Sequence, residues 1–589
     1  MHPSKAFYSE ELKKRIAELN ELKKKLTTNS ILRFASFITT ALGIYFTFQN
    51  IWMAAAIFII GIAVFIFFVV KHTNLQFKSN LTSEKIKINE IEIAALDRKF
   101  HQLDEGNEFK DGTHFFSNDI DLFGYGSFFQ YINRTTTKDG KQKLADNLTS
   151  NVISEIEKKQ KGLKELSTKV LWRQHFAAIS SIFTNKVDSK SILKWILSYE
   201  VKLPSFLKIL TKVFSLITIT LFVLTILNIT SFTFLTVWFF VGMGITGRYL
   251  KDIQNLYTKA GKAKEIFKQY SELLMNIEEV DFKSEILTEK QKNITFNNQK
   301  ASSIFKQFSK ILDAFDQRNN IIFAVFGNGL FLWDIQNATK TENWIHLYKN
   351  TVKEWFETVS FFDAHNSLAN FVYNHPTYVF PELTPSENII LAENLGHPLL
   401  DPTKRVDNDF NILNEEFFIV TGANMAGKST FLRTVSLSIV MANCGLPVCA
   451  SSFTYQPIKL ITSMRTSDSL NDDESYFYSE LKRLKFIVDA TQKENYFIIL
   501  DEILKGTNSK DKAIGSKRFV EKLNKSKSTG IIATHDVSLC DLADEYSTIK
   551  NYYFDAEIVD NELYFDYSMK DGVCKNMNAS FLLQRMEIV

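Results

Sequence analysis

Four long apolar runs interrupt an otherwise charged, helical pattern in the first half of the chain. They occur in two pairs, at 31–48 with 51–70 and at about 213–229 with 232–248. Each run has 17 to 20 residues, close to the ~20 that an α-helix needs to cross the hydrocarbon layer of a membrane. Apart from Arg33 near an outer end and an arginine that closes the second pair, the runs carry no charge. The pattern predicts four transmembrane helices.

Short polar turns join the two runs of each pair, so each pair is predicted to form a helical hairpin. The turns are Gln49-Asn50 and Thr230-Ser231, and neither contains Lys or Arg. Lysines and arginines flank the outer ends of both hairpins instead, and positive flanks favour the cytoplasmic side. We therefore expect a multi-pass protein of the inner (cytoplasmic) membrane, with its N-terminus and C-terminal half in the cytoplasm. The alternative is four buried helices of a soluble core, which rarely lack a polar stripe.

A glycine-rich turn follows the apolar run 417–420 in the last third of the chain. It reads Gly422-Ala-Asn-Met-Ala-Gly-Lys-Ser-Thr430 and fits a phosphate-binding loop, in which a strand leads into the turn and a helix follows. Gly422 and Gly427 let the backbone amides face a triphosphate, and the helix N-terminus favours the same charge. Lys428 is predicted to reach the β and γ phosphates, and the Ser429 hydroxyl to hold Mg²⁺. The sequence therefore predicts a nucleotide site.

Two further apolar runs end in candidate catalytic residues. The run 496–500 ends in Asp501-Glu502, and the run 530–534 ends in His535. Asp501 suits Mg²⁺ binding, and Glu502 suits polarising the attacking water. His535 lies where a side chain could sense the γ-phosphate, although an isolated histidine is more often structural. Together the three strand ends predict an ATPase, with nucleotide binding without hydrolysis as the weaker alternative.

These motifs, taken in order, resemble the ATPase domain of the MutS mismatch-repair family over about 170 residues, to the end of the sequence. The matching segments are 396–399, 421–430, 473–480, 500–508, 533–536 and 551–556. The resemblance implies an α/β P-loop ATPase domain of the MutS/ABC type that follows an α-helical core and lever region. It also implies ATP and Mg²⁺ as cofactors.

The resemblance assigns further roles to single residues. It places Asn424, Met425 and Thr430 in the nucleotide-binding loop, and Ser475 at the position that reaches the nucleotide of a partner subunit. It places Tyr553 on one face of the adenine. The implied assembly is a homodimer through the ATPase domains, and the implied macromolecular partner is DNA.

The sequence departs from the family pattern in two places. Ala423 and Ala426 replace the usual Pro and Gly of the loop, and because both are small we expect phosphate binding to survive. The aromatic residue that usually stacks on adenine is replaced near Arg405 and Val406. An arginine can also stack on a base, so the geometry of adenine binding is left open.

Upstream, the segment 121–135 with Thr137 and Gly140 resembles the start of the MutS helical core. The less favoured alternative is an ordinary turn before a helix, with Asn133 and Thr135 as caps. The expected order is a basic helix at 1–30, the first hairpin at 31–71, a connecting helix and core start at 72–205, the second hairpin at 206–248, a helical lever at 249–395 and the ATPase domain at 396–589. No segment before the core resembles the family's mismatch-sensing domain or its Phe-x-Glu wedge. Mismatch recognition by that wedge is therefore not expected.

Composition agrees with a protein that is partly in a membrane. The 589 residues are 45% hydrophobic and include 52 Phe. A net charge of +3 is too small to indicate nucleic acid by itself, and the lysine groups at 138–143 and 158–161 are more typical of solvated helix faces. The four cysteines have no metal-type spacing and indicate a reducing cytoplasm.

Three functions fit these features. The first is a membrane-anchored MutS-like ATPase that dimerises and acts on DNA. The second is an ATP-driven membrane remodelling or signalling protein that binds no DNA. The third is an ATP-binding-cassette transporter, which is disfavoured because the segment 473–480 lacks the Leu-Ser-Gly-Gly-Gln-like signature of that class.

Overall fold

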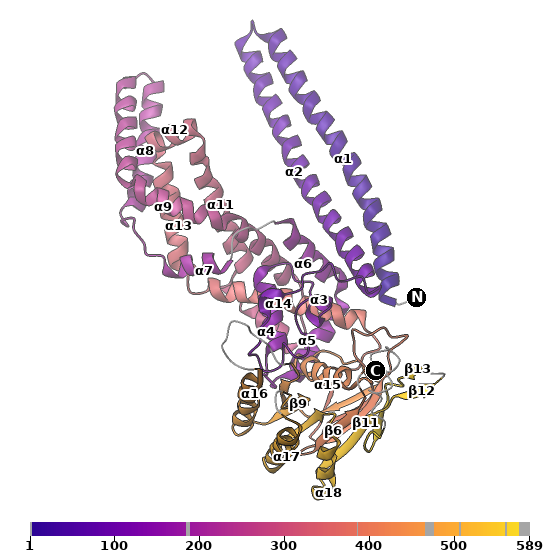
Figure 1. The fold of residues 1–589 in the computed structure, drawn as a ribbon. Helices are drawn as coiled ribbons and strands as arrows, with labels where there is room; N and C mark the ends of the chain where they lie inside the picture. The colour runs from indigo at the N-terminus through magenta and orange to yellow at the C-terminus, as the bar shows by residue number, and fades with distance from the viewer. Residues whose placement is uncertain are drawn as a thin grey trace.

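Two helical arms and a domain of mixed sheets extend from a central group of helices. The structure is a computed structural model that describes residues 3–183, 189–385, 387–423, 425–465, 476–505, 508–559 and 562–575. Figure 1 shows both arms pointing away from the sheets, which lie at the opposite end of the molecule. The nucleotide-binding motifs and the apolar runs therefore lie at opposite ends of the folded molecule.

The first arm is a hairpin of two long helices, α1 (Pro3–Thr47) and α2 (Ile51–Leu96). The basic segment and the first apolar run form one continuous helix, because no glycine or proline separates them. Asn50 caps α2 by accepting a hydrogen bond from the amide of Met53 at 3.3 Å. Around this turn large apolar side chains are exposed, including Phe46 and Trp52 at 78% and 84%. Such a tip is stable only in an apolar environment or against a partner.

The second arm contains more apolar helices than the sequence pattern predicted. It consists of α8 (Leu207–Ile226), α9 (Phe232–Glu278), α11 (Ala301–Asp316), α12 (Ile321–Phe331) and α13 (Trp333–Tyr348). The sequence pattern placed 321–331 in the lever, yet Ile321 and Ile322 are 79% and 71% exposed. The helix is only 11 residues long, too short to stand out as a span.

Close packing of backbones holds α12 against α8 and α9. A Cβ atom at Gly242 of α9 would lie 2.3 Å from the carbonyl oxygen of Gly329, so only glycine fits there. Leu332 has a φ of +51° and ends α12. Near that end, the hydroxyl of Thr218 donates to the carbonyl of Leu330 at 2.6 Å. The contact satisfies a backbone group that would be costly to leave unpaired in lipid.

The prediction of four transmembrane helices is not confirmed. Among the described residues three helices, α1, α2 and α8, are long and apolar enough to cross a membrane, and α12 with α13 would make a fourth only as one span bent by 82°. The predicted fourth run, 232–248, lies in α9, which is not one of the three. Its three glycines between 242 and 247, together with Thr246 and Arg248, lower its apolar content.

The central group of helices packs around α14 (Val352–Asn374), which is buried along most of its length. The other members are α3 (Phe128–Ile132), α4 (Lys138–Thr149), α5 (Ile156–Thr168), α6 (Val170–Ile182), α7 (Ser189–Ser198) and α10 (Glu285–Lys292). The segment 133–137 lies against α14. Asp363 accepts hydrogen bonds from the amide and hydroxyl of Thr137 at 2.8 and 2.7 Å. Asn133 also caps locally, since its side chain accepts from the amide of Thr135 at 3.0 Å.

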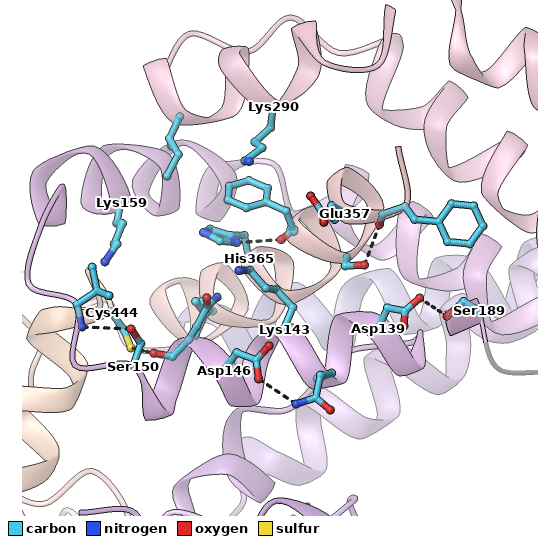
Figure 2. A pocket seen from close by; sticks show the side chains of 18 of the residues that line it. Asp139, Lys143, Asp146, Ser150, Lys159, Ser189, Lys290, Glu357, His365 and Cys444 are labelled. Atoms are coloured by element: carbon cyan, nitrogen blue, oxygen red, sulfur yellow. Dashed lines mark hydrogen bonds between the residues drawn. The ribbon is translucent and has the colours of Figure 1, made fainter. Parts of the chain in front are cut away.

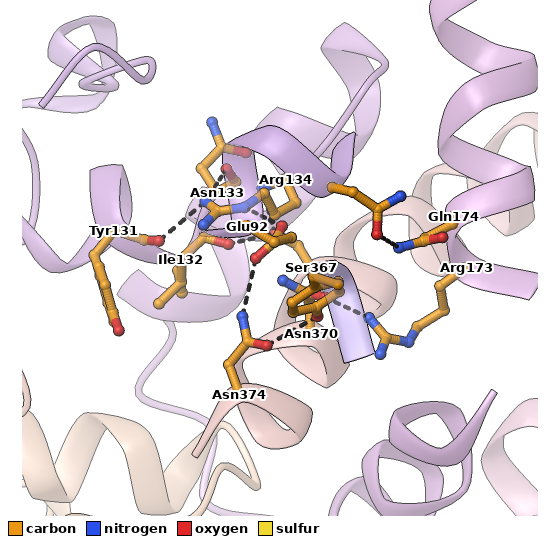
Figure 3. A network of polar contacts seen from close by, with 12 residues as sticks. Glu92, Tyr131, Ile132, Asn133, Arg134, Arg173, Gln174, Ser367, Asn370 and Asn374 are labelled. Atoms are coloured by element: carbon orange, nitrogen blue, oxygen red, sulfur yellow. Dashed lines mark hydrogen bonds and ion pairs between the residues drawn. The ribbon is translucent and has the colours of Figure 1, made fainter. Parts of the chain in front are cut away.

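A buried polar network joins the first arm to this group (Figure 3). Glu92 of α2 pairs with Arg134 at 2.6 Å and accepts from the side-chain amide nitrogen of Asn374 at 2.9 Å. Tyr8 of α1 donates to the Asn374 side chain at 2.9 Å, and Arg173 of α6 donates to that of Asn370 at 2.8 Å. The base of the arm is thus fixed to α14 by hydrogen bonds as well as by packing.

The C-terminal domain contains a six-stranded sheet ordered β14-β11-β6-β10-β9-β8. Its strands are β6 (Phe417–Gly422), β8 (Lys459–Ser463), β9 (Tyr496–Asp501), β10 (Thr529–Ala533), β11 (Ile549–Phe554) and the antiparallel β14 (Met569–Asp571). A four-stranded sheet is formed by β3 (Glu382–Leu383), β7 (Ser452–Tyr455), β4 (Asn388–Leu395) and β5 (Asn408–Leu413). The helices are α15 (Lys428–Asn443), α16 (Tyr476–Thr491), α17 (Ser509–Lys525) and α18 (Leu542–Glu545).

Candidate functional site

The three strands that carry the nucleotide motifs are neighbours. β10 pairs in parallel with β6 on one side and with β9 on the other, and Ala533 lies level with both Val420 and Asp501. Their carboxyl ends therefore meet at one edge of the sheet, where ligands bind in open α/β folds. A cavity of about 710 Å³ opens there, lined by residues of the glycine-rich loop and of all three strand ends. Its size suits a nucleotide.

The glycine-rich loop has the backbone geometry that its sequence predicts. A Cβ atom at Gly422 would lie 2.4 Å from the carbonyl oxygen of Phe554, and Gly427, with a φ of +109°, precedes the first turn of α15. Met425 also has a positive φ and is 76% exposed, although it lines the cavity. The turn is tight because β11 runs beside it, and it aims the N-terminus of α15 at the cavity.

Lys428 and Thr430 both line the cavity. The Lys428 ammonium is buried and donates to the carbonyls of Gly422 and Ala423 at 2.7 and 2.9 Å. Burial lowers its pKa from the ordinary lysine value, while the charges of Asp501 and Glu502 oppose the shift. A buried cation at the start of a helix is well placed to bind phosphate oxygens.

Ser429 and Asp501, the two predicted magnesium ligands, are in direct contact. The Ser429 hydroxyl donates to Asp501 Oδ2 at 2.7 Å, although the residues are 72 positions apart. Mg²⁺ typically takes one or two protein oxygens and completes its shell with phosphates and water. Two converging oxygens beside the loop fit that requirement. No cluster of three or more His, Cys, Asp or Glu suited to a metal occurs in the described part of the chain.

Glu502 lies at the same edge and is held by two lysines that sequence reasoning missed. Its Oε1 pairs with Lys512 Nζ at 2.9 Å, and its Oε2 lies 3.7 Å from Lys505 Nζ. Burial alone would raise the pKa of the Glu502 carboxyl. The hydrogen bond to Lys512 and the charges of Lys512, Lys505 and His535 together lower it below the ordinary glutamate value. Glu502 is therefore ionised at neutral pH, as a general base must be.

His535 also lines the cavity, after the end of β10. Partial burial lowers the pKa of its imidazole, and the charge of Lys428 lowers it further, while Glu502 and Asp501 act in the opposite direction. The ring is therefore neutral at pH 7 and can donate one hydrogen bond and accept another. This protonation state suits contact with a phosphate oxygen or with water.

The aromatic residues that line the cavity are not the one predicted to contact the adenine. Phe554 and Tyr567 line the cavity, and Tyr553 is not among the lining residues. Tyr567 Cδ1 would lie 3.2 Å from a Cβ atom at Gly427, so this aromatic ring is close to the loop. Neighbouring side chains of a strand point to opposite faces of the sheet. Because Phe554 of β11 faces the cavity, its neighbour Tyr553 points to the other face.

Arg405 and Val406 also line the cavity, as the sequence suggested. Arg405 is fixed by a two-pronged ion pair with Asp407, at 2.5 and 3.0 Å. A guanidinium held this way presents a flat face on which a base can stack. His397, from the upstream motif, also lines the cavity. Burial lowers its pKa to about 4, and nearby arginines lower it as well.

Asn424 and Ser475 lie outside the described residues, as do positions 506 and 507 of the turn after β9. Lys512 could not have been found from spacing, because it follows the helix cap Asn508 in α17 and no motif includes it. Tyr567 has no sequence signal either, since it lies 137 residues beyond Thr430. Both reach the site through tertiary folding alone.

Comparison with known proteins gives the same assignment for this domain. Residues 418–584 match the family model of MutS domain V. The chain is 33% identical over 229 residues to the DNA mismatch repair protein MSH4 of Arabidopsis thaliana, covering 37% of this chain and 28% of that protein. It is 32% identical over 213 residues to the DNA mismatch repair protein MutS of Methanococcoides burtonii, covering 34% and 24%.

A third relative, the DNA mismatch repair protein MutS of Staphylococcus epidermidis, is 28% identical over 286 residues, or 47% of this chain and 32% of that protein. The matched region thus spans about a quarter to a third of the length of these relatives. The P-loop, the strand order and the family match all lie in the same part of the chain. The C-terminal domain of this chain is therefore similar to MutS domain V.

Proposed function

We propose that this protein is a membrane-anchored MutS-like ATPase that binds and hydrolyses ATP in a dimer and acts on DNA. The observation that supports hydrolysis most strongly is the convergence of Ser429, Asp501, Glu502 and His535 on the cavity beside the glycine-rich loop. Ser429 comes from the start of α15, Asp501 and Glu502 from the end of β9, and His535 from the end of β10. Each has a hydrogen bond or a charge state that its role needs.

The proposed chemistry follows from these positions. Lys428 binds the β and γ phosphates, and the amides of the loop and of α15 bind the remaining oxygens. Ser429 and Asp501 would hold Mg²⁺, which neutralises charge on the phosphate oxygens when bound. Glu502, being ionised, orients the attacking water and accepts its proton. His535, being neutral, donates a hydrogen bond to the γ-phosphate.

The dimer and the DNA substrate rest on family resemblance. Ser475 of one subunit would complete the nucleotide site of the other, so ATP would close the dimer and hydrolysis would release it. The three relatives are named as DNA mismatch repair proteins. Movement of the ATPase domains would reach the arms through α14, to which the first arm is tied by Glu92 and Tyr8.

Membrane anchoring rests on the exposed apolar surface of the arms. We propose that α1, α2, α8 and the first part of α9 cross the cytoplasmic membrane, with α12 packed beside them. Both arms point away from the ATPase domain (Figure 1), so one bilayer can receive both tips while the nucleotide site faces the cytoplasm. The lysines at the base of α1 would then lie at the cytoplasmic surface, as the positive-inside tendency requires.

The test is the ATPase rate of the detergent-solubilised chain with and without duplex, mismatched and branched DNA, using Glu502→Gln as the blank. We expect at least one DNA structure to raise the rate or to change the affinity for ATP. An ATPase that responds to no DNA, at low as well as physiological salt, would contradict the DNA role. That result would favour the remodelling or signalling function, in which the nucleotide cycle moves the arms alone.

A further inference from the structure

A second cavity, separate from the nucleotide site, lies where the central helices meet the ATPase domain. It has a volume of about 640 Å³, within the range of small-molecule sites. Figure 2 shows its lining side chains, which come from α4, α5, α7, α10 and α14 and from the end of α15. Its lining includes members of the lysine groups at 138–143 and 158–161, which the sequence pattern assigned to solvated helix faces.

Four lysines line it. Lys190 lies on α7. The other three are Lys143 of α4, Lys159 of α5 and Lys290 of α10. They surround His365 of α14, a buried imidazole whose Nδ1 contacts the carbonyl oxygen of Phe361 at 2.9 Å. Its Nε2 makes no hydrogen bond with any residue that the structure describes.

The charges of Lys143, Lys159 and Lys290 all lower the pKa of His365, so the three ammonium groups lie around the same imidazole. Burial lowers the pKa of His365 to about 3, the contact with Phe361 opposes this, and the positive charges of Lys143, Lys159 and Lys290 add to the lowering. Burial also lowers the pKa of Lys159, whose ammonium donates to the carbonyl of Asn443 at 3.2 Å. Bringing several ammonium groups together in a partly desolvated cavity costs free energy unless an anion is bound.

The carboxylates that line the cavity already have partners. Asp146 accepts from Gln142 at 2.9 Å, Asp139 accepts from Tyr270 at 3.1 Å, and Glu357 lies 3.7 Å from Lys353. By contrast, neither Lys143 nor Lys290 has a carboxylate within 4 Å among the described residues. Four lysines and three carboxylates line the cavity, so the lining carries an excess of one positive charge, and the ammonium groups of Lys143 and Lys290 are left for a bound anion.

An apolar surface lies beside this charge. Phe356 and Phe361 of α14 line the cavity and are otherwise buried, and the Phe361 ring stacks on His365 with centroids 3.7 Å apart. Lysine ammonium groups are common ligands of phosphate. We propose that this cavity binds a small phosphorylated organic molecule, whose phosphate contacts Lys143, Lys159 and Lys290 and whose apolar part lies against Phe356 and Phe361.

The site is connected to the nucleotide site by a single helix. Asn443 and Cys444 line the cavity at the end of α15, and the same helix begins with Lys428 and Ser429. A ligand that contacts one end of this 16-residue helix can change the position of the other end. Any such coupling must be reciprocal, so ATP and the second ligand would change each other's affinity by the same factor.

The test uses 1-naphthyl phosphate as the probe and the full chain in detergent, carrying Lys428→Ala to suppress phosphate binding at the nucleotide site. Calorimetry measures its dissociation constant. We expect Lys143→Gln with Lys290→Gln to weaken binding at least about tenfold, since hydrogen bonds to charged groups contribute about 1.5–3 kcal/mol. Lys161→Gln is the matched control, because Lys161 of α5 is exposed and does not line the cavity. It should leave the dissociation constant unchanged.

A second readout is hydrogen exchange. Bound probe should slow exchange in 138–149 and 285–292, the helices that carry Lys143 and Lys290. The proposal is wrong if no binding is seen up to about 10 mM, if the double variant binds as well as its parent, or if Lys161→Gln weakens binding equally. Because Lys428→Ala is present throughout, failure here would leave the proposed ATPase activity untouched.

Discussion

At the scale of single residues, the functional site is built from side chains that constrain one another. Glu502 has a φ of +51°, a conformation that costs a non-glycine residue free energy and tends to occur at functional sites. Its amide donates to the carbonyl of Ala533 at 2.9 Å, and its carboxylate is held by Lys512 and Lys505. The strand register, the turn and the lysines together fix this carboxylate near the end of β10.

Lys428 and Glu502 are expected to have separable roles. Lys428→Ala removes a charged phosphate ligand and should weaken ATP binding by about 10- to 100-fold, from about 1.5–3 kcal/mol. Glu502→Gln keeps the size of the side chain but cannot accept a proton, so binding should persist while turnover falls by at least about 100-fold. Nucleotide titration and phosphate release measure the two effects. Hydrolysis by Glu502→Gln at the parental rate would refute its assignment as the general base.

Lys512 is expected to set the pH range of catalysis. Because Lys512 helps to lower the pKa of Glu502, the parent enzyme should keep its activity as the pH falls toward the ordinary glutamate range. Lys512→Met removes that charge, so the pKa of Glu502 should rise and the acid limb of kcat/KM should move to higher pH. A pH profile of both proteins from about 4.5 to 8 measures the shift. An unchanged acid limb would mean that Lys512 does not act on the group that controls it.

At the scale of elements, α14 connects the parts of the molecule. One side of this helix presents Asp363, Ser367, Asn370 and Asn374, and these side chains bond to the segment 132–137, to α1, α2 and α6. The last three of them are seen in Figure 3. A polar network of this kind is costly if one member is removed, because the remaining groups are left buried without partners.

Glu92 is the member whose removal should cost most. Its side chain is 3% exposed and that of Arg134 is 15% exposed. Glu92→Gln leaves the Arg134 charge without its counter-ion and should lower the free energy of unfolding by about 3 kcal/mol. Urea unfolding followed by circular dichroism measures it. Glu84→Gln, which breaks a more exposed pair with Lys87 on the same helix, should cost less than about 1 kcal/mol; equal effects would show that the network adds no stability.

Sequence patterns predicted some elements and contacts of this fold but not others. Apolar runs and the glycine-rich turn predicted β6, β9 and β10, and the rule that parallel strands end at one edge predicted the meeting of Ser429 and Asp501. Local patterns could not predict the network of Glu92, Arg134 and Asn374, because its members are 42 to 282 positions apart. Local patterns also did not predict the positions of Tyr567, Lys512 and α12, because tertiary packing alone determines them.

At the scale of the whole molecule, the arms and the ATPase domain lie at opposite ends (Figure 1). Exposed large apolar side chains occur at both tips, with Phe46 and Trp52 at one and Phe232 at the other, while the nucleotide cavity lies in the ATPase domain. If the arms are anchored as proposed, this arrangement would allow a nucleotide cycle in water to act on elements in lipid.

The proposed topology predicts which surfaces are accessible from outside the cell. Asn50→Cys and Asn228→Cys place thiols at the turns of the two hairpins. Both should react with a membrane-impermeant maleimide added to intact cells, because each pair of spans would place its turn beyond the membrane. Ser526→Cys, after α17 in the ATPase domain, should react only after lysis. The four native cysteines are buried and should contribute little background. Labelling of Ser526→Cys in intact cells, or protection of both turns, would contradict this topology.

The in-trans site predicts complementation between two inactive proteins. Glu502→Gln and Ser475→Ala should each have little activity alone. A mixed dimer regains one complete site of its two, with Glu502 from one subunit and Ser475 from the other, so random mixing should restore about a quarter of the parental activity. Phosphate release from each protein and from the mixture measures this. Activity in the mixture that equals the average of the two separate proteins would refute the shared site.

ATP hydrolysis by the full chain in lipid vesicles, compared with the same preparation of Glu502→Gln, tests the central claim most directly. The proposed function predicts Mg²⁺-dependent phosphate release by the parent protein and only background release by the variant, with both proteins binding ATP. Equal release by the two proteins, or ATP binding without release by the parent, would contradict it.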